Sequence, residues 1–213
     1  MTSKDYAGGP REPILKPVPM KALRPTQITV GFREVKTRRQ RWKRVTTKAK
    51  RASFLQKHLI PVVLGPGGEH YILDHHHLAL ALYQEGLRKM YVTVVADLSR
   101  LDTGSFWFVM DNRNWIYPFD HKGARQPHTA IPRSIDGLVD DPFRSLAGEL
   151  RRAGGFAKDT TLYSEFLWAD FLRRRLKAKS VTRDFPRALR RALKLAKSKE
   201  ANYLPGWCGP VEE

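Results

Sequence analysis

The segment from Ile60 to Leu98 most constrains the fold, because it switches twice between extended and helical patterns. Its first part, IPVVLGPGGEHYILD, predicts a hairpin with strands over residues 60–64 and 70–73 and a glycine-rich turn between them. The next part, HHHLALALYQEG, favours a helix that stops at Gly86, and MYVTVVADL predicts a returning strand. The predicted order is strand, turn, strand, helix, strand, which indicates an α+β fold.

The remaining segments predict a helical second half. A helix is expected over residues 36–58, and the aromatic-rich run FWFVMDNRNWIYPFDHKG is expected to cover the core as a strand or loop. Further helices are expected from about Pro142, over YSEFLWADFLRRRLKAK, and over RDFPRALRRALKLAKSKE. These expectations divide the chain into a flexible N-terminal segment, an α+β core, a helical extension packed on that core and a basic helical tail: residues 1–16, 17–130, 131–178 and 179–213.

The charge of the chain indicates a polyanionic partner. The formal net charge is +18, an excess that is typical of proteins that bind nucleic acid, nucleotides or anionic membranes. Between residues 36 and 57 ten Lys or Arg residues occur without an acid, and between residues 173 and 199 twelve occur with Asp184 as the only acid. The second block predicts a basic amphipathic helix, which could lie on the body of the protein, on nucleic acid or on a membrane.

Cysteine usage and hydropathy predict a soluble, cytoplasmic protein. Cys208 is the only cysteine, so an internal disulfide and a multi-cysteine zinc site are excluded. No apolar run is long enough for a signal peptide or a membrane span.

The sequence Asp74-His75-His76-His77 stands where the second predicted strand gives way to the helix. The first backbone N–H groups of that helix, from His75 to Leu78, have no intrahelical partner and carry the positive end of the helix dipole, so they can bind an anion. His76 and His77 would add donors. Asp74 could cap the helix, which is worth about 1 kcal/mol, orient a histidine, or hold a Mg²⁺ ion that bridges phosphates.

A structural zinc site is disfavoured at these histidines. Consecutive residues of a helix point about 100° apart, so three adjacent histidines cannot face one metal ion. His121 and His128 are isolated in a predicted loop and supply no second pair.

Five segments together carry a resemblance to a known family. LRPTQITVGFREV, then PVVLG and YILDHHHLALAL, are followed by DDPFRSLAGELRRAGGF and EFLWADFLR. Over residues 17–174 the chain resembles the ParB-like nuclease family of the ParB/sulfiredoxin superfamily. The resemblance implies a mixed sheet with helices. It also implies phosphate chemistry with ATP or CTP as substrate or ligand, because the superfamily includes CTP-binding partition proteins, ATP-using sulfiredoxins, free serine kinases and proteins with reported nuclease activity.

The resemblance also assigns residues to roles. Asp74, His76 and His77 match the family's box and are the predicted catalytic residues, together with Glu34, which stands where some relatives place a catalytic carboxylate. Asp74 is also the predicted metal ligand. The predicted phosphate-binding residues are His75, Leu78, Arg144, Ser145, Arg33 and Lys36.

Two positions depart from the family's box. His75 replaces the usual glycine and narrows the approach of a phosphate to the backbone, and Leu78 stands where an arginine or polar residue is common. Outside the box, Arg38, Arg39 and Arg113 could line a phosphate groove, and the aromatic residues 106–115 could stack a base or simply pack in the core.

Two functions are therefore carried forward. The first is an enzyme that acts on phosphate bonds, by nucleotide hydrolysis, by phosphoryl transfer or by Mg²⁺-dependent DNA cleavage. The second is a catalytically inert basic module that binds DNA or RNA.

Overall fold

The computed structural model describes residues 14–210, and these form two compact units. Unit 1 comprises the described residues up to Ile28, together with Lys36–Pro118 and Gln126–Leu138. Unit 2 comprises Thr29–Val35, Phe119–Arg125 and the described residues from Val139 onward. The predicted helical extension and basic tail thus fall in one unit, except for residues 131–138, which belong to unit 1, and 211–213, which lie outside the described residues.

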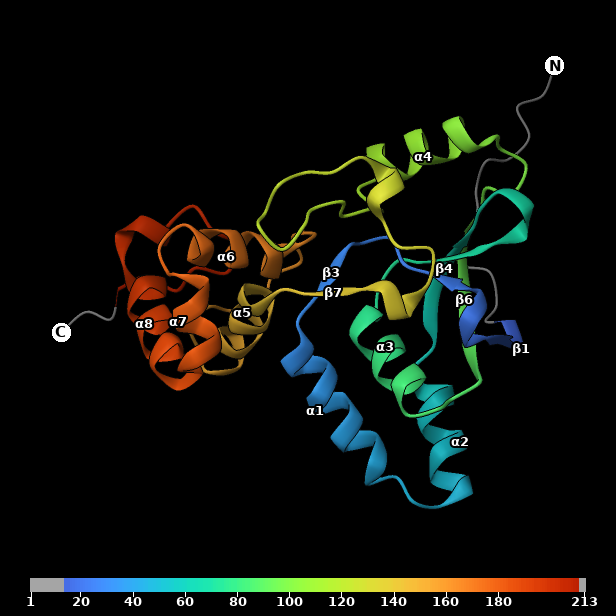
Figure 1. The fold of residues 1–213 in the computed structure, drawn as a ribbon, viewed down its shortest axis with the longest axis horizontal. Helices are drawn as coiled ribbons and strands as arrows, with labels where there is room; N and C mark the ends of the chain where they lie inside the picture. The colour runs from blue at the N-terminus through green and yellow to red at the C-terminus, as the bar shows by residue number, and fades with distance from the viewer. Residues whose placement is uncertain (1–13, 211–213) are drawn as a thin grey trace. The chain divides into compact units, whose positions relative to one another are not determined.

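Unit 1 is built on a five-stranded mixed sheet, so the predicted α+β class is confirmed (Figure 1). The predicted hairpin is present, because its two strands pair antiparallel with Val62 opposite Ile72. The returning strand pairs parallel with the first strand of the hairpin, which is the arrangement that a crossover through a helix requires. In spatial order the strands are β1 (Ile14–Pro19), β6 (Lys89–Asp97), β4 (Ile60–Leu64), β5 (His70–Ile72) and β2 (Leu23–Arg24).

The N-terminal prediction was wrong where it can be compared. Strand β1 begins at Ile14, inside the segment 1–16 that was expected to be loosely ordered. Residues 1–13 of that segment lie outside the described residues.

Four α-helices precede residue 113: α1 (Phe32–Lys43), α2 (Lys48–Lys57), α3 (His76–Gln84) and α4 (Thr103–Asn112). The first turn of α1 belongs to unit 2, and the rest of these helices belong to unit 1. The prediction of one continuous helix over residues 36–58 was wrong. The β-branched residues Val45, Thr46 and Thr47 lie between α1 and α2, and the hydroxyl of Thr47 accepts the N–H of Lys50 at 3.2 Å to start the second helix.

The aromatic-rich segment contains helix α4, so the expectation of a strand or loop there was also wrong. Asp102 caps this helix by accepting the N–H of Ser105 at 3.0 Å. Phe106 and Met110, one helical turn apart, are buried in the core of unit 1, whereas Trp107 is half-buried.

Unit 2 contains a short parallel pair of strands followed by four helices. The strands are β3 (Thr29–Val30) and β7 (Val139–Asp140), and the helices are α5 (Pro142–Arg152), α6 (Ser164–Arg173), α7 (Ala178–Arg183) and α8 (Phe185–Lys197). The predicted start of α5 is confirmed, with Asp141 accepting the N–H of Phe143 at 2.9 Å and proline at the first helical position. Trp168 stacks on Phe156 in the core of this unit, with ring centroids 4.4 Å apart.

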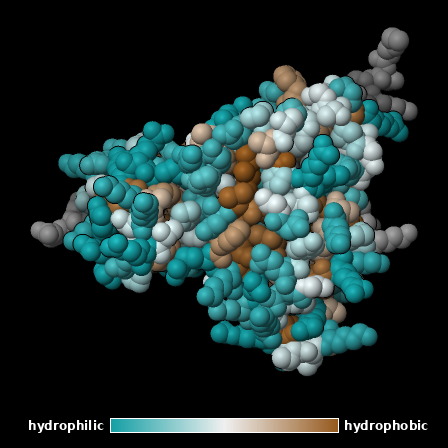
Figure 2. Space-filling model, viewed as in Figure 1, coloured by the Kyte–Doolittle hydropathy of each residue, from teal (hydrophilic) through white to brown (hydrophobic). Residues whose placement is uncertain are grey.

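Helix α8 packs on the body of unit 2 through its apolar side. Ala188, Ala192 and Ala196 are buried in the core, and Leu189 and Leu193 pack against it. Much of the surface that Figure 2 shows over α6–α8 is hydrophilic. Of the alternatives for this basic amphipathic helix, contact with the body is the one observed, because its apolar stripe is already covered.

Short 3₁₀ turns complete the chain at η1 (Met20–Ala22), η2 (Pro66–Gly68), η3 (His128–Ala130), η4 (Ile135–Gly137) and η5 (Lys199–Ala201). Within residues 14–210, no helix has both the length and the apolar character to cross a membrane.

Candidate functional site

The junction of β5 and α3 places Asp74 and His75 directly before the helix. The sequence offered Asp74 as the N-cap of α3, but His75 occupies that position. His75 has the left-handed conformation, with φ 68° and ψ 21°. The Asp74 carboxylate instead accepts the N–H of His75 at 2.6 Å. Asp74 is displaced from the cap because the left-handed residue after it bends the chain just before the helix. Glycine adopts this conformation without cost, and here His75 stands in its place.

His75 is half-buried, and its Nδ1 atom has no hydrogen-bond partner within the part of the chain that the structure describes. Burial is the largest influence on its pKa and lowers it, the Asp74 carboxylate raises it, and the charges of Arg38 and His58 lower it further. The neutral imidazole is therefore favoured. The contribution of Arg38 also shows that a cation from α1 lies near this junction.

His76 is buried and already has a hydrogen-bond partner. Its Nε2 accepts the backbone N–H of Thr26 at 3.1 Å, and complete burial lowers its pKa to about 4. Nε2 is thus an acceptor that ties α3 to the segment after β2. His77 and Leu78 are buried as well, so only the Asp74 and His75 side chains of this group reach solvent. The predicted catalytic roles of Asp74, His76 and His77 stay predictions.

The backbone at this helix start can still attract an anion. The first intrahelical bond runs from the N–H of Ala79 to the carbonyl of His75, at 2.8 Å. The N–H groups of residues 76–78 precede that bond, at the end of the helix that carries positive partial charge.

A metal site made only of protein ligands is not found among residues 14–210, where no three His, Cys, Asp or Glu side chains are grouped to hold an ion. Mg²⁺ has different needs, since it commonly uses one or two carboxylates together with water and substrate phosphates. The Asp74 side chain is 79% exposed and fits that requirement.

Unit 2 brings together a second group of predicted residues around the middle of α5. The Arg144 side chain is only 9% exposed; one guanidinium nitrogen pairs with Glu165, while Nε and Nη1 have no hydrogen-bond partner among the described residues. A Cβ atom added to Gly148 would lie 3.4 Å from Nη1 of Arg144 and 3.7 Å from Oε2 of Glu34. The absence of a side chain at Gly148 thus leaves a methyl-sized space, which a buried cation and a carboxylate both border at ordinary contact distance.

Two charged residues near this space were not assigned from the sequence. Nη2 of Arg152 would lie 3.7 Å from the same added Cβ, and its pKa is raised by hydrogen bonding to Glu149 and, more weakly, by the charges of Glu34 and Glu165. Glu165, the partner of Arg144, also pairs with Arg151 at 3.0 Å. The nine-residue segment RSLAGELRR contains Arg152 among several charges, but nothing in it points to Glu165 or to Glu34, which lies more than one hundred residues earlier.

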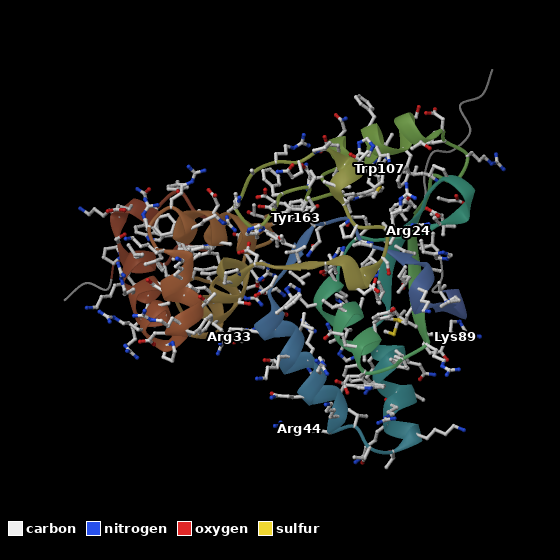
Figure 3. All side chains as sticks on the ribbon, viewed as in Figure 1. Arg24, Arg33, Arg44, Lys89, Trp107 and Tyr163 are labelled. Carbon is white, nitrogen blue, oxygen red and sulfur yellow. The ribbon has the colours of Figure 1, made fainter. Side chains whose placement is uncertain are left out.

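Ser145, Arg33 and Lys36 are placed differently. The buried Ser145 hydroxyl accepts the N–H of Arg33 at 3.3 Å, so it holds the start of α1. The Arg33 guanidinium lies over the ring of Phe185, 3.8 Å from its centroid, at the position labelled in Figure 3. Lys36 is exposed on α1. Their predicted phosphate-binding roles stay predictions, as do those of His75 and Leu78.

Comparisons with known proteins agree with the resemblance. A model of the family described as "Putative ParB-like nuclease" matches residues 16–174. Among solved structures, the chain is similar to the crystal structure of protein Atu1540 from Agrobacterium tumefaciens, with 50% sequence identity, a TM-score of 0.85, and 92% of this chain and 98% of that chain covered. No curated protein matches the chain.

Proposed function

This chain belongs to the ParB-like nuclease family, which points to a nucleic-acid-related function, and from that premise we propose that it breaks a phosphate bond of a nucleic acid or nucleotide. In this proposal the phosphate oxygens are bound by Arg144, and Glu34 serves as the carboxylate that accepts a proton from the attacking water. Asp74 lies in unit 1 and is proposed, apart from these two residues of unit 2, as a ligand for Mg²⁺.

The observation that carries the proposal is the state of Arg144. A buried donor without a partner costs about 1–3 kcal/mol, and this guanidinium has two such nitrogens. Nε and Nη1 donate from different edges of the guanidinium, and Nη2 between them pairs with Glu165, so a phosphate oxygen can satisfy one of the two free donors. The surrounding charges are balanced, because Glu165 pairs with Arg144 and Arg151 and Glu149 pairs with Arg152, so the proposal depends on the free donors of Arg144 and not on an excess of positive charge.

Arg144→Gln is therefore expected to weaken binding of a phosphate-bearing substrate by about 10- to 150-fold, the loss that corresponds to a hydrogen bond with a charged group. Purified full-length protein would be incubated with Mg²⁺ and, separately, ATP, CTP and supercoiled plasmid DNA, with binding and product formation both measured. The matched control is Arg174→Gln, which removes an exposed arginine of the same unit that pairs with Asp170 at 2.8 Å.

Thermal melting of each variant shows whether the fold survives. Gly148→Ala adds a second check, because alanine suits a helix interior better than glycine by about 1 kcal/mol yet fills the space beside Arg144. A stable Gly148→Ala protein with weakened binding supports the site. A wild-type protein that turns over none of the three substrates contradicts the enzymatic proposal.

A second candidate function, nucleic-acid binding without catalysis, is favoured by a basic groove on α7 and α8. The groove has a volume of about 540 Å³, and its cations are Lys179, Arg183, Arg187 and Arg191. The one acid that lines it, Asp184, accepts the N–H of Arg187 at 3.0 Å as the cap of α8. A membrane is the weaker partner for this surface, because the apolar side of α8 is packed in the core.

The groove predicts salt-dependent binding of duplex DNA. Each phosphate that a Lys or Arg neutralises contributes about −0.9 to the slope of log affinity against log salt, so replacing all four cations by glutamine is expected to make that slope shallower by about 3 to 4. Fluorescence anisotropy with a labelled duplex at several salt concentrations measures it. Replacing four exposed cations of the other basic block, Lys43, Arg44, Lys48 and Lys50, is the charge-matched control. Equal slopes for the wild type and the groove variant would exclude the groove as the contact.

A further inference from the structure

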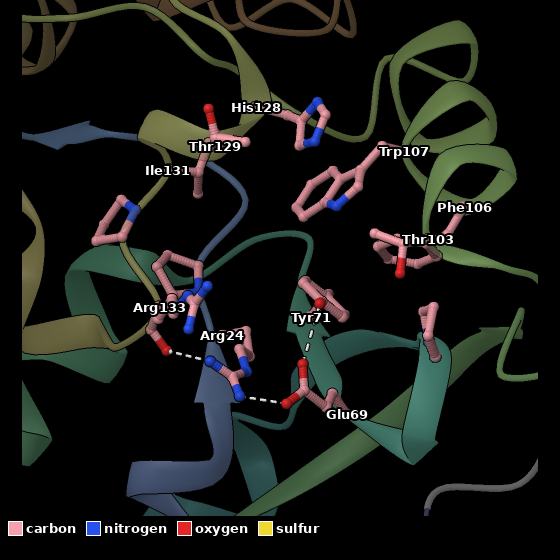
Figure 4. Close-up of a pocket in the computed structure, with 13 residues that line it drawn as sticks. Arg24, Glu69, Tyr71, Thr103, Phe106, Trp107, His128, Thr129, Ile131 and Arg133 are labelled. Atoms are coloured by element: carbon pink, nitrogen blue, oxygen red, sulfur yellow. Dashed lines mark hydrogen bonds and ion pairs between the residues drawn. The ribbon is translucent and has the colours of Figure 1, made fainter.

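Unit 1 contains a pocket of about 460 Å³ that none of the predicted catalytic or phosphate-binding residues lines. Its walls come from the end of β2, the start of β5, helix α4 and the segment around η3 (Figure 4). The volume lies within the usual range for small-molecule sites. Its chemistry can be read from two groups of side chains, one cationic and one aromatic.

The cationic side of the pocket is formed by Arg24 and Arg133, and contacts with its neighbours hold Arg24 in place. This guanidinium pairs with Glu69 and donates to the backbone carbonyl of Arg133 at 3.1 Å. Two of its five N–H donors are used in these contacts. The Arg133 side chain adds a second positive charge, so the pocket carries two guanidinium groups against one carboxylate.

Tyr71 keeps the carboxylate of Glu69 oriented. Its hydroxyl donates to Glu69 at 3.1 Å. Burial, and then the contact with Glu69, raise the pKa of Tyr71 to about 12, so the hydroxyl stays a donor at neutral pH. The polar lining is thus held by contacts within the pocket itself.

The aromatic side of the pocket is formed by Trp107 and His128. Their rings are stacked, with centroids 4.9 Å apart and an interplanar angle of 19°, and Tyr71 meets Trp107 edge-on at 5.4 Å. Figure 4 shows these rings on one side of the pocket and Arg24 and Arg133 on the other. Thr103, Phe106 and Trp107 of α4 line the pocket, and Phe106 is also buried in the core together with Met110.

A ligand for such a pocket needs a flat ring to lie against aromatic side chains and acceptor atoms for two arginines. An aliphatic ligand would offer no acceptor atoms to the two guanidinium groups, and an acidic peptide would not need the aromatic wall. We propose that the pocket takes an unpaired nucleobase, either of a free nucleotide or of a single-stranded segment. The choice of a nucleobase rests on the proposed nucleic-acid function; the pocket itself does not.

The experiment uses the full-length protein and compares two changes on α4. Trp107→Leu removes the aromatic wall, and Phe108→Leu is its control, because Phe108 is 70% exposed on the same helix and does not line the pocket. Stacking of a base on an aromatic ring is worth a factor of about 5 to 150 in affinity. Binding of a labelled single-stranded octanucleotide is expected to weaken by that factor for Trp107→Leu and to change less than about twofold for Phe108→Leu.

Further probes separate the two sources of the base. AMP competes with the octanucleotide if a free nucleotide enters the pocket, whereas ribose 5-phosphate, which lacks a base, does not. If only the octanucleotide binds, the base comes from a strand. A second variant, Thr103→Trp, fills the pocket while leaving Trp107 in place, and it serves if Trp107→Leu melts at a much lower temperature than the wild type.

The outcomes distinguish this proposal from the proposed function. If both pocket variants bind like the wild type while Arg144→Gln weakens binding, the pocket proposal is overturned and the phosphate site stands. If the pocket variants weaken binding and Arg144→Gln does not, the pocket proposal stands and the phosphate site at Arg144 is overturned. If the wild type binds none of these probes, both proposals are wrong.

Discussion

Glu34→Gln is expected to lower the rate of phosphate-bond hydrolysis by about 10²- to 10⁴-fold, the usual contribution of a positioned general base. The reason is that an amide cannot accept the proton of the attacking water, while its size and shape are nearly those of the carboxylate. Arg144 and Arg152 remain beside the space over Gly148, so substrate binding is expected to change far less than turnover. Single-turnover kinetics on whichever of ATP, CTP or plasmid DNA is cleaved separates the two effects.

The control for this change is Glu149→Gln. Glu149 lies on the same helix as Arg144 and pairs with Arg152 at 2.8 Å, so the control removes the same charge from the same neighbourhood. If both variants slow hydrolysis equally, Glu34 acts only through the local electrostatic potential and is not the base. Full activity of Glu34→Gln would remove it from the mechanism.

The second large effect concerns the stability of the protein at acid pH. The folded-state pKa of His76 is about 4, against an ordinary value of 6.5. The unfolded chain therefore binds a proton more readily than the folded protein between these values. The contribution of neutral His76 to the free energy of unfolding is complete above about pH 6.5. It declines as the pH falls towards 4 and changes little below that. The difference of pKa corresponds to about 3 kcal/mol.

His76→Gln tests this assignment, because a glutamine oxygen can accept the N–H of Thr26 but does not titrate. Urea unfolding of both proteins at pH 7 and at pH 4.5 gives the free energies of unfolding. Carboxyl groups and His75 also titrate in this range, but they do so in both proteins, so the comparison isolates His76. Parallel pH profiles for the two proteins would mean that the imidazole is accessible and titrates normally.

The elements that could be predicted are those whose signals lie close together in the sequence. The hairpin, the stop of α3 near Gly86 and the start of α5 at Asp141 and Pro142 depend on turn glycines, a cap and a proline within a few residues. Helix α4 was missed because its apolar and aromatic residues fit a strand equally well. Only the cap at Asp102 and the spacing of Phe106 and Met110 decide between the two.

The candidate sites were less predictable, since they depend on contacts between distant segments. Arg24 and Glu69 pair across 45 positions, and no local pattern connects them. The replacement of the family's glycine by His75 was visible, but the sequence did not reveal that this backbone is left-handed. His76 was a predicted catalytic residue, but it is buried and its Nε2 accepts the backbone N–H of Thr26, 50 residues earlier. No local pattern indicates that contact.

Helix α8 separates the residues that pack the core from the residues that carry charge. Its alanines fill the interior of unit 2 while Arg187 and Arg191 line a groove on its other side. Two separate sets of positions along a single helix thus serve folding and charge. The number of cations on this surface can therefore be changed by substitution with little effect on the packing of the unit.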